Sequence, residues 1–223
     1  MEWRLLNAGA FSLPLYTTPQ RFLATSTFAL AWIVALSFSA RSLLSYESAP
    51  GTVGKVPSTW PSRSKIQLAP DGDTLVMLAH PHCPCTRASV GELAQVMAHV
   101  QGKIKAYVLF LHPQDSPGDW DNTDLTRSAA QIPGVTLVAD LNGVEARRFG
   151  AETSGQTLLF DSTGHLLFHG GITESRGHAG GNAGENAIIS LVNKRGTDRT
   201  DTFVFGCSLF DHADAGGKFE CRK

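Results

Sequence analysis

Two cysteines one residue apart, Cys83 and Cys85, are the residues of this chain best suited to chemistry. They lie in the stretch HPHCPCTR, which follows the apolar run TLVMLA and opens a segment with helical periodicity. A thiolate at the start of a helix is stabilised by unpaired backbone N–H groups and by the positive end of the helix dipole. The pattern therefore predicts either a reactive thiol site or a metal site at this strand-to-helix junction.

In the redox interpretation, Cys83 is the nucleophile and Cys85 is the resolving cysteine. We expect Cys83, at the helix cap, to be the more exposed of the two. The basic neighbours lower the thiol pKa, and the intervening proline limits how the backbone relaxes around a strained ring, which favours an easily reduced disulfide. No metal or cofactor is then required. The expected supporting residues around the pair are His82, Pro84, Thr86 and Arg87.

Metal binding is the alternative chemistry, because sulfur and imidazole ligands suit Cu(I) or Zn(II). The histidines in the later half of the chain have no diagnostic spacing to the cysteines: His165, His169 and His178. The candidate ligands are Cys83, Cys85, His82 and Cys207.

The carboxy-terminal run TFVFGCSLFD is apolar enough to dock on the domain. If it folds back toward the first helix, Cys207 serves as a third thiol or a third ligand. Cys221 is either free or paired with Cys207, and the spacing does not decide between the two.

Composition excludes some classes of function. The net charge is −1 with 17% charged residues, so no basic surface argues for nucleic-acid binding. Four cysteines are too few for a disulfide-based scaffold in 223 residues.

Residues 22–40, FLATSTFALAWIVALSFSA, form a charge-free run between Arg21 and Arg41. About twenty apolar residues span a bilayer as a helix. We favour a retained single-pass membrane anchor over a cleaved signal peptide, with the rest of the chain on the extracytoplasmic side. The predicted organisation is an N-terminal segment 1–21, a transmembrane helix 22–40, a flexible linker 41–72, a globular domain 73–195 and a tail 196–223.

The globular part alternates strand and helix patterns in the order β-α-β-α-β-α-β-β-α. Such alternation predicts a parallel sheet with a terminal antiparallel hairpin. The predicted strands are 74–79, 104–111, 135–139, 156–160 and 165–168. The predicted helices are 85–100, 122–132, 142–150 and 184–194. The carboxyl ends of the strands are where chemistry gathers in open α/β sheets.

From residue 70 to 195 the chain resembles the thioredoxin superfamily, through the strand–cysteine–helix unit, the following βαβ and the closing hairpin LLFDSTGHLLFHGGI. More narrowly, HPHCPCTRAS, GGITESRGHAGGNAGENA and VFGCSLFD resemble the membrane-anchored RedB proteins. The resemblance implies a three-layer fold with helices on both faces of a mixed sheet, and a protein thiol or disulfide as partner.

The same resemblance implies that Arg176 and His178, on the glycine-rich loop, line the site. Two departures bear on the function: the pair is C-x-C instead of C-x-x-C, and no proline stands near Gln156, where the superfamily places one facing the cysteines. A third interpretation is therefore a non-catalytic binding module with the same fold.

Overall fold

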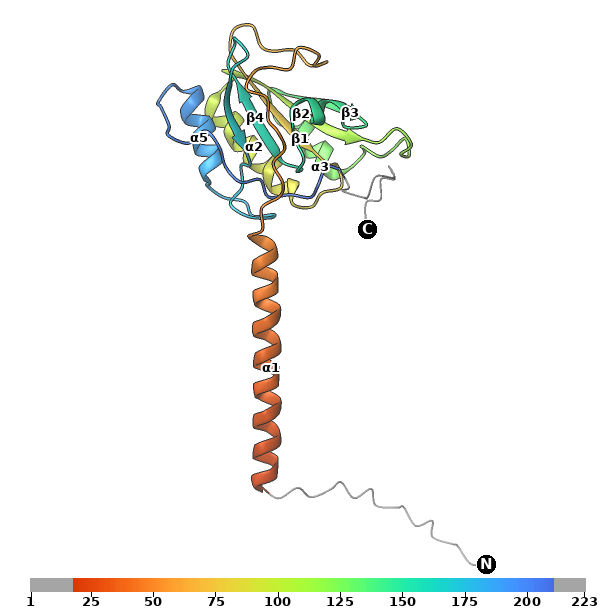
Figure 1. The fold of residues 1–223 in the computed structure, drawn as a ribbon, viewed down its shortest axis with the longest axis vertical. Helices are drawn as coiled ribbons and strands as arrows, with labels where there is room; N and C mark the ends of the chain where they lie inside the picture. Colours follow the sequence, from red (N-terminus) through yellow and green to blue (C-terminus); the bar gives the residue numbers. More distant parts are fainter. Residues whose placement is uncertain (1–17, 211–223) are drawn as a thin grey trace, which may run out of the picture. The chain divides into compact units, whose positions relative to one another are not determined.

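The computed structural model of this chain describes residues 18–210. The chain divides into two units, one ending at Leu44 and the other beginning at Ser45. Helix α1, Thr18–Glu47, makes up the described part of the first unit and continues into the second (Figure 1).

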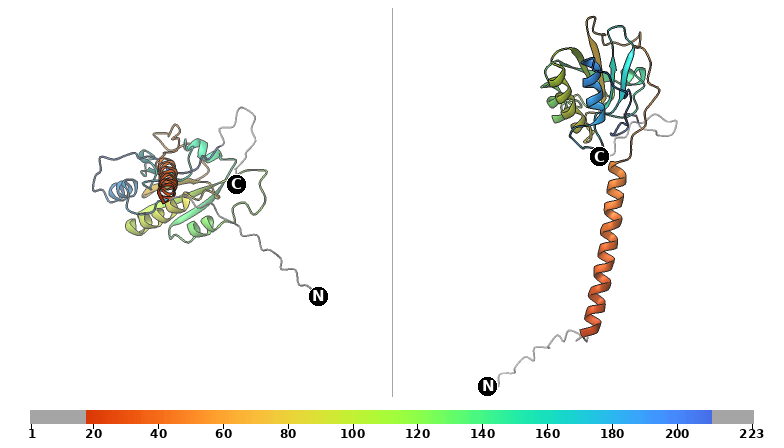
Figure 2. Two further views of the ribbon diagram at one scale, coloured as in Figure 1. Left: turned by 90° about the horizontal axis from the view of Figure 1, so that it is seen from below. Right: turned by 90° about the vertical axis from the view of Figure 1, so that its left-hand side faces the viewer.

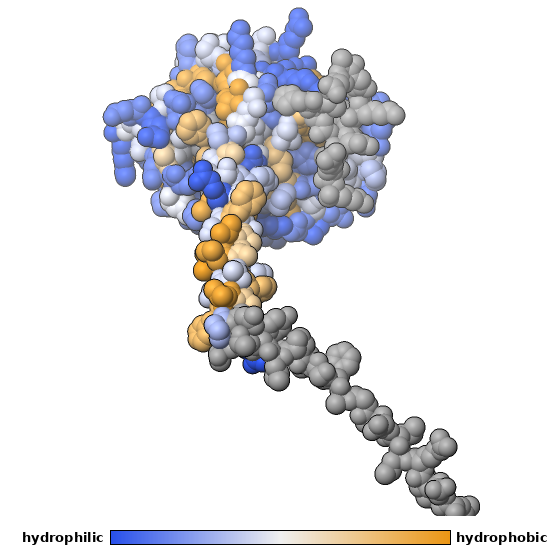
Figure 3. All heavy atoms as spheres, turned by 60° about the horizontal axis from the view of Figure 1, so that its bottom comes forward, coloured by the Kyte–Doolittle hydropathy of each residue, from blue (hydrophilic) through white to orange (hydrophobic). Residues whose placement is uncertain are grey.

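Helix α1 is long and apolar enough to cross a membrane. Its stretch Arg21–Glu47 contains a window of mean hydropathy 1.7 in which no residue is buried, and Figure 3 shows mostly apolar side chains along it. The hydroxyls of Thr25 and Ser37 donate to backbone carbonyls four residues earlier, at 2.9 and 2.7 Å, so they cost the apolar surface little. The length and position of α1 also suit a signal sequence.

A five-stranded sheet forms the centre of the second unit, in the order β3-β2-β1-β4-β5 (Figure 1). The first three strands are mutually parallel, and β4 runs antiparallel to both β1 and β5. The strands are β1 (Asp73–Ala79), β2 (Ile104–His112), β3 (Val135–Leu141), β4 (Gln156–Phe160) and β5 (Leu166–Gly170).

Both faces of the sheet are covered. The alternating side chains of β1 divide between two apolar clusters, with Leu75 and Met77 in one and Val76 and Leu78 in the other. The first cluster includes side chains of α2 (Thr86–Val100), α3 (Asp124–Ala130) and α5 (Ala183–Val192), and the second includes α4 (Val144–Arg148). Figure 2 shows α2 and α5 next to each other in its right-hand view.

This topology is thioredoxin-like, which confirms the expected fold class. The predicted helices and strands of the domain all occur, with ends shifted by at most two residues. Of the two hairpin strands, β4 lies beside the central strand β1 and β5 forms one edge of the sheet, while β3 forms the other edge.

The segment between α1 and β1 differs from the expected flexible linker. Residues 41–47 continue helix α1, and the residues that follow lie along the domain in extended and turn conformations. The Trp60 ring contacts those of Phe149 and Phe160 edge-on, with centroids 5.2 Å apart in each case, and Ile66 is buried. Proline, glycine and serine prevent regular structure in this segment, but its few apolar side chains still gain by leaving water.

Candidate functional site

The cysteine pair lies where β1 turns into α2, at the carboxyl end of the central strand. The Cys83 N–H donates to the His80 carbonyl at 3.1 Å, and the Thr86 N–H donates to the Cys83 carbonyl at 3.2 Å. Helix α2 begins at Thr86, with Cys85 as its N-cap residue. Pro84 suits this turn because it has no N–H to satisfy.

The expectation that Cys83 occupies the cap and is the more exposed cysteine is wrong. Cys85 takes the cap position, and the two residues are 3% (Cys83) and 8% (Cys85) exposed. A distant part of the chain covers them, which no local pattern around the pair indicates.

The covering segment is the C-terminal run 202–210, called here the tail segment. Its Cys207 Sγ lies 2.9 Å from the Cys83 Sγ, and the Cys207 N–H points at the same sulfur at 3.4 Å. The Sγ atoms of Cys83, Cys85 and Cys207 all lie within 4.8 Å of one another. The predicted third thiol is thus brought to the pair. Cys221 lies outside the described residues.

The tail segment docks on the residues that precede β4 by backbone hydrogen bonds. The Ser154 N–H donates to the Cys207 carbonyl, and the Leu209 N–H donates to the Glu152 carbonyl, both at 2.8 Å. A Cβ atom at Gly206 would meet the Ser154 carbonyl oxygen at 1.9 Å. Glycine at 206 therefore permits the close approach that places Cys207 against Cys83.

Several donors converge on the Cys83 sulfur and lower the pKa of its thiol from 9.0 to about 4. The largest cause is the hydrogen bond from the Cys207 thiol, followed among the lowering causes by the Thr86 hydroxyl and by backbone N–H groups of both residues. Burial opposes the shift without cancelling it. Cys83 is therefore a thiolate at neutral pH, the form that acts as nucleophile and metal ligand.

Ser154 orients the Thr86 hydroxyl. The Ser154 Oγ accepts the His80 N–H at 2.7 Å and lies 2.6 Å from the Thr86 Oγ1. The Thr86 hydroxyl has a single proton, which it donates to the Cys83 sulfur, so in its contact with Ser154 the Thr86 oxygen accepts the Ser154 hydroxyl proton. A short chain of hydrogen bonds therefore runs from Ser154 through Thr86 to the Cys83 sulfur.

The other two thiols are held protonated. The pKa of Cys207 is raised, first by the hydrogen bond that its thiol donates to Cys83, then by burial and by the neighbouring negative charge. The pKa of Cys85 is raised by burial and by the charge on Cys83. Arg176 opposes both shifts through its charge, and its guanidinium donates to the Gly206 carbonyl. Arg176 therefore lies close enough to the sulfur cluster to act on both thiols.

Other residues predicted to support the pair lie elsewhere. Arg87 points away from the sulfurs and forms an exposed ion pair with Asp124 at 2.5 Å, and it is not among the causes of the Cys83 shift. His178 is exposed on its loop and has no described contact with the cysteines. Pro84 is exposed within the turn.

His82 contacts an aromatic side chain and does not reach the sulfur cluster. Its ring centroid lies 4.4 Å from that of Trp120, and the His80 centroid lies 5.7 Å from the same indole. The Trp120 indole N–H donates to the Leu111 carbonyl at 3.0 Å, which fixes the indole beside the two histidines.

Sequence reasoning missed Ser154 and Trp120. Both follow unremarkable polar stretches, and neither has a spacing to the cysteines that indicates contact. The segment before β4 was expected to face the cysteines near Gln156, and it is Ser154, two residues earlier, that does so. Gln156 is buried, and its amide nitrogen donates to the Gly150 carbonyl at 3.4 Å.

The ligand set for a metal differs from the one expected. Within residues 18–210, the only group of three or more metal-ligating side chains gathered at one point consists of the three cysteines. His82 does not belong to it, nor do His165 and His169 from the hairpin half of the domain. Three sulfur atoms form a soft donor set that fits Cu(I) or Zn(II) better than hard cations.

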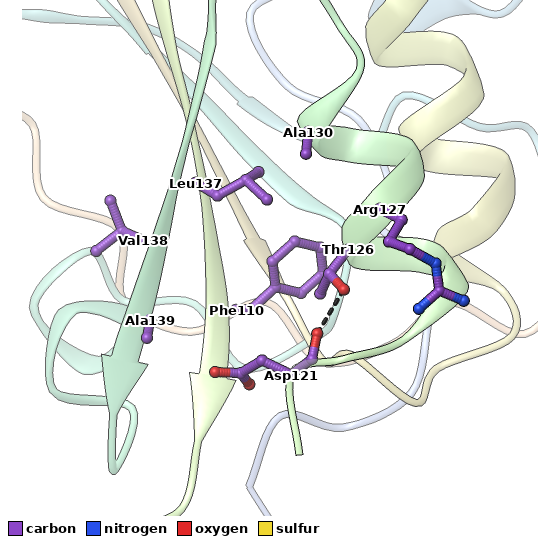
Figure 4. Close-up of a pocket in the computed structure, with 8 residues that line it drawn as sticks. All are labelled: Phe110, Asp121, Thr126, Arg127, Ala130, Leu137, Val138 and Ala139. Carbon is purple, nitrogen blue, oxygen red and sulfur yellow. Dashed lines mark hydrogen bonds between the residues drawn. The ribbon is translucent and has the colours of Figure 1, made fainter. Parts of the chain in front are cut away.

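A separate depression of about 300 Å³ lies between α3 and the strands β2 and β3 (Figure 4). Phe110 and Leu137 form its apolar floor, and Arg127 and Asp121 lie at its polar side. The Thr126 hydroxyl donates to the Asp121 backbone carbonyl, and the buried Oδ1 of the Asp121 carboxylate has no hydrogen-bond partner among the described residues. No thiol lines the depression, and the chemistry is therefore placed at the sulfur cluster.

Comparison with known proteins shows similarity in fold. No family model matches the chain, and no curated protein matches it in sequence. An uncharacterised conserved protein from Geobacillus kaustophilus superposes with a TM-score of 0.54 at 15% identity, over 75% of this chain and 95% of that one. A hypothetical protein from Sinorhizobium meliloti gives 0.52 at 16% identity, over 73% and 96%.

The thioredoxin domain of a thiol-disulfide oxidoreductase from Bacteroides vulgatus overlaps less closely, with a TM-score of 0.39 at 14% identity over 66% of this chain and 97% of that one. At these identities the Geobacillus and Sinorhizobium structures show a shared fold, and activity is argued from the site.

Proposed function

We propose that this chain is a membrane-tethered thioredoxin-like protein that performs thiol–disulfide exchange with Cys83 as the nucleophile. The observation that carries the proposal is the Cys83 sulfur itself: its pKa is lowered to about 4 by convergent donors, and a second thiol lies 2.9 Å away. A purely structural cysteine needs neither a stabilised thiolate nor a neighbouring thiol.

The exchange balances without a cofactor. The Cys83 thiolate attacks one sulfur of a partner's disulfide, forms a mixed disulfide and releases the partner's other sulfur as a thiolate. A second thiol of this chain then attacks the Cys83 sulfur, so that the partner leaves fully reduced and the chain holds a disulfide. The sequence predicts Cys85 for that second step.

The proposal is tested with the full chain in detergent micelles, reduced and then freed of reductant. Oxidised glutathione is added at pH 7, and mixed disulfides are trapped by acid and identified by mass spectrometry. We expect a glutathione adduct on Cys83 in the wild type or in variants that lack a resolving thiol. We expect no such adduct in Cys83→Ser. A Cys83 that stays unmodified in every variant, while Cys85 or Cys207 reacts, rejects the proposal.

A metal carrier is the second candidate function, and the sulfur cluster is the observation that favours it. The ligands would be Cys83, Cys85 and Cys207, which replaces the histidine-containing set expected from sequence. Anaerobic titration with Cu(I) in competition with a chelator distinguishes the two functions: one tightly bound ion per chain, lost in each single cysteine variant, supports a carrier. Weak binding that survives the loss of Cys207 rejects it.

The location of the chain follows from α1. We propose that α1 is retained as an anchor and that the domain faces an oxidising, extracytoplasmic compartment, where a pair of exchanging thiols finds disulfide partners. The narrower RedB resemblance remains a prediction from sequence, since no matching family model or curated protein supports it. Recovery of an uncleaved chain in the membrane fraction, with Cys83 labelled from the outside, tests this placement.

A further inference from the structure

We propose that Cys207, and not Cys85, is the resolving cysteine, and that the tail segment carrying it occupies the place that an extended partner segment takes on the residues before β4. This inference rests on the proposed thiol–disulfide exchange and assigns its second step. Its evidence is the position of three sulfurs and the way in which the tail segment is held.

The backbone favours Cys207 over Cys85 as the partner of Cys83. Cys85 has helical dihedral angles, φ −67° and ψ −33°, and the hydrogen bond from the Thr86 N–H to the Cys83 carbonyl closes a turn across the pair. A Cys83–Cys85 disulfide would require this turn to unwind at the start of α2. The Cys207 sulfur is already 2.9 Å from that of Cys83, so only a small approach separates it from the bonded distance of about 2.05 Å.

The charges in the cluster free Cys207 to react in the second step; the charges of Cys83 and Arg176 act on Cys85 in the same direction, so geometry alone decides between the two thiols. Its thiol is held protonated by the hydrogen bond to Cys83 and by the Cys83 charge. Once Cys83 is part of a mixed disulfide, that charge and that acceptor are gone, and the Arg176 charge remains to favour the Cys207 thiolate. The resolving thiol therefore becomes a nucleophile only after the first step has taken place.

The tail segment must leave before a partner reaches Cys83, because Cys83 is 3% exposed. Around Cys207 the segment is held by backbone groups: the Ser154 N–H and the Glu152 carbonyl form an antiparallel bridge with it, while the side chains of Val204 and Leu209 on either side are buried. Any extended peptide can use these groups, since they carry no side-chain specificity. The partner is therefore a protein that presents its disulfide on an extended segment.

The electrons balance over the two steps. The Cys83 thiolate breaks the partner's disulfide and forms the mixed disulfide. The tail segment then docks again, and the Cys207 thiolate attacks the Cys83 sulfur and releases the partner's second sulfur as a thiolate, which takes up a proton. The partner gains two electrons, and the chain loses them in forming the Cys83–Cys207 disulfide.

The positions of lysine and arginine allow a direct test by tryptic digestion. Cys83 and Cys85 fall on one peptide, residues 66–87, whereas Cys207 falls on 200–218 and Cys221 on 219–222. The reduced full chain in micelles is oxidised with oxidised glutathione, quenched in acid and digested. We expect peptide 66–87 linked to 200–218. An internal disulfide within 66–87, with 200–218 free, overturns the inference and leaves the proposed function intact.

Matched single variants give the second measurement, the lifetime of the glutathione adduct on Cys83. We expect Cys207→Ser to prolong it by at least about 100-fold, because the resolving step loses its intramolecular thiol. Cys85→Ser should change it less than about twofold, and the link between 66–87 and 200–218 should still form. The reverse pattern, with the long-lived adduct in Cys85→Ser, overturns the inference.

Two controls keep the outcomes separate. Cys221→Ser removes the fourth thiol and should leave both the link and the adduct lifetime unchanged. Cys207→Ala guards against a misfolded serine variant: both substitutions must give the same prolonged adduct and the same circular dichroism spectrum. If no variant forms an adduct on Cys83, the proposed function fails as well, and that outcome is distinguishable from a resolving role for Cys85.

Discussion

The loop 80–87 and the tail segment 202–210 reach the same sulfur by different routes. The loop is organised by its neighbours in sequence, through the turn at Pro84 and the start of α2 at Thr86. The tail segment arrives from the far end of the domain and is held by backbone bonds to the residues before β4. The sulfur of Cys85, the nearest thiol in sequence, lies within 4.8 Å of the Cys83 sulfur across a tight turn, whereas the sulfur of the distant Cys207 lies 2.9 Å away.

This contrast shows that a short cysteine spacing alone does not identify a redox couple. The hydrogen-bonded turn across the pair would have to unwind for a Cys83–Cys85 disulfide, so this C-x-C pair at a helix start needs a third group to complete a low-strain disulfide. Here the third group is Cys207, whose segment also covers Cys83 and whose thiol stabilises the Cys83 thiolate.

The largest effect is expected from Gly206→Ala, which undocks the tail segment. The added Cβ would meet the Ser154 carbonyl oxygen at 1.9 Å. We expect iodoacetamide to alkylate Cys83 about tenfold faster at pH 7 than in the wild type. Opening of the tail segment, which exposes Cys83, becomes easier by about 1.4 kcal/mol. Loss of the Cys207 hydrogen bond also raises the Cys83 pKa toward the range in which a thiol is the best nucleophile.

The matched control is Gly181→Ala, because a Cβ at that glycine meets nothing within 4 Å. It should leave the alkylation rate of Cys83 unchanged. Equal rates in wild type and Gly206→Ala would show that the tail segment does not limit access to Cys83.

A smaller effect is the dependence of stability on pH. Folding lowers the pKa of Cys83 from 9.0 to about 4, so between these values the unfolded chain binds the proton that the folded chain has lost. This stabilisation is complete above the unfolded pKa and is lost as pH falls through the folded one. We expect the free energy of unfolding of the reduced chain to rise from pH 5 to 8, by up to about 1.4 kcal/mol per pH unit.

Denaturant titration followed by tryptophan fluorescence measures this slope. Cys83→Ser should flatten it between pH 5 and 8. Cys207 affects the free energy of unfolding in the opposite direction, because folding raises its pKa. That effect depends on pH only above the ordinary pKa of a cysteine thiol, which lies outside this window. An unchanged slope in Cys83→Ser would contradict the low pKa.

The smallest expected effect is on the pKa of Cys83, and it distinguishes the two residues that follow Cys85 in sequence, Thr86 and Arg87. Thr86→Val removes the hydroxyl that donates to the Cys83 thiolate and should raise the Cys83 pKa by about one unit. Arg87→Ala should change it by less than about 0.3 unit, since Arg87 is paired with Asp124 in solvent. Thiolate ultraviolet absorbance against pH measures both. A larger shift in Arg87→Ala would restore the role expected for Arg87 from sequence.

The fold was largely predictable because its signals are local. The stripe through Leu93 and Val100, the branched residues of β2 and the turn before His165 each act within a few residues. The order of strand and helix patterns then restricts the sheet topology to few possibilities. The position of β4 beside β1 depends on pairing across the sheet, and the packing of Trp60 depends on distant rings, so neither follows from periodicity.

Sequence by itself determined that Cys83 and Cys85 lie at the end of a buried strand and the start of a helix, because apolar periodicity and the helix start are encoded within about twenty residues. Only the tertiary structure decided that Cys207 contacts Cys83, that Ser154 directs the Thr86 hydroxyl toward it, and that Arg87 and His178 stay apart. The physical reason is that hydrogen bonds and van der Waals contacts act over a few ångströms, and folding sets which residues meet within that range.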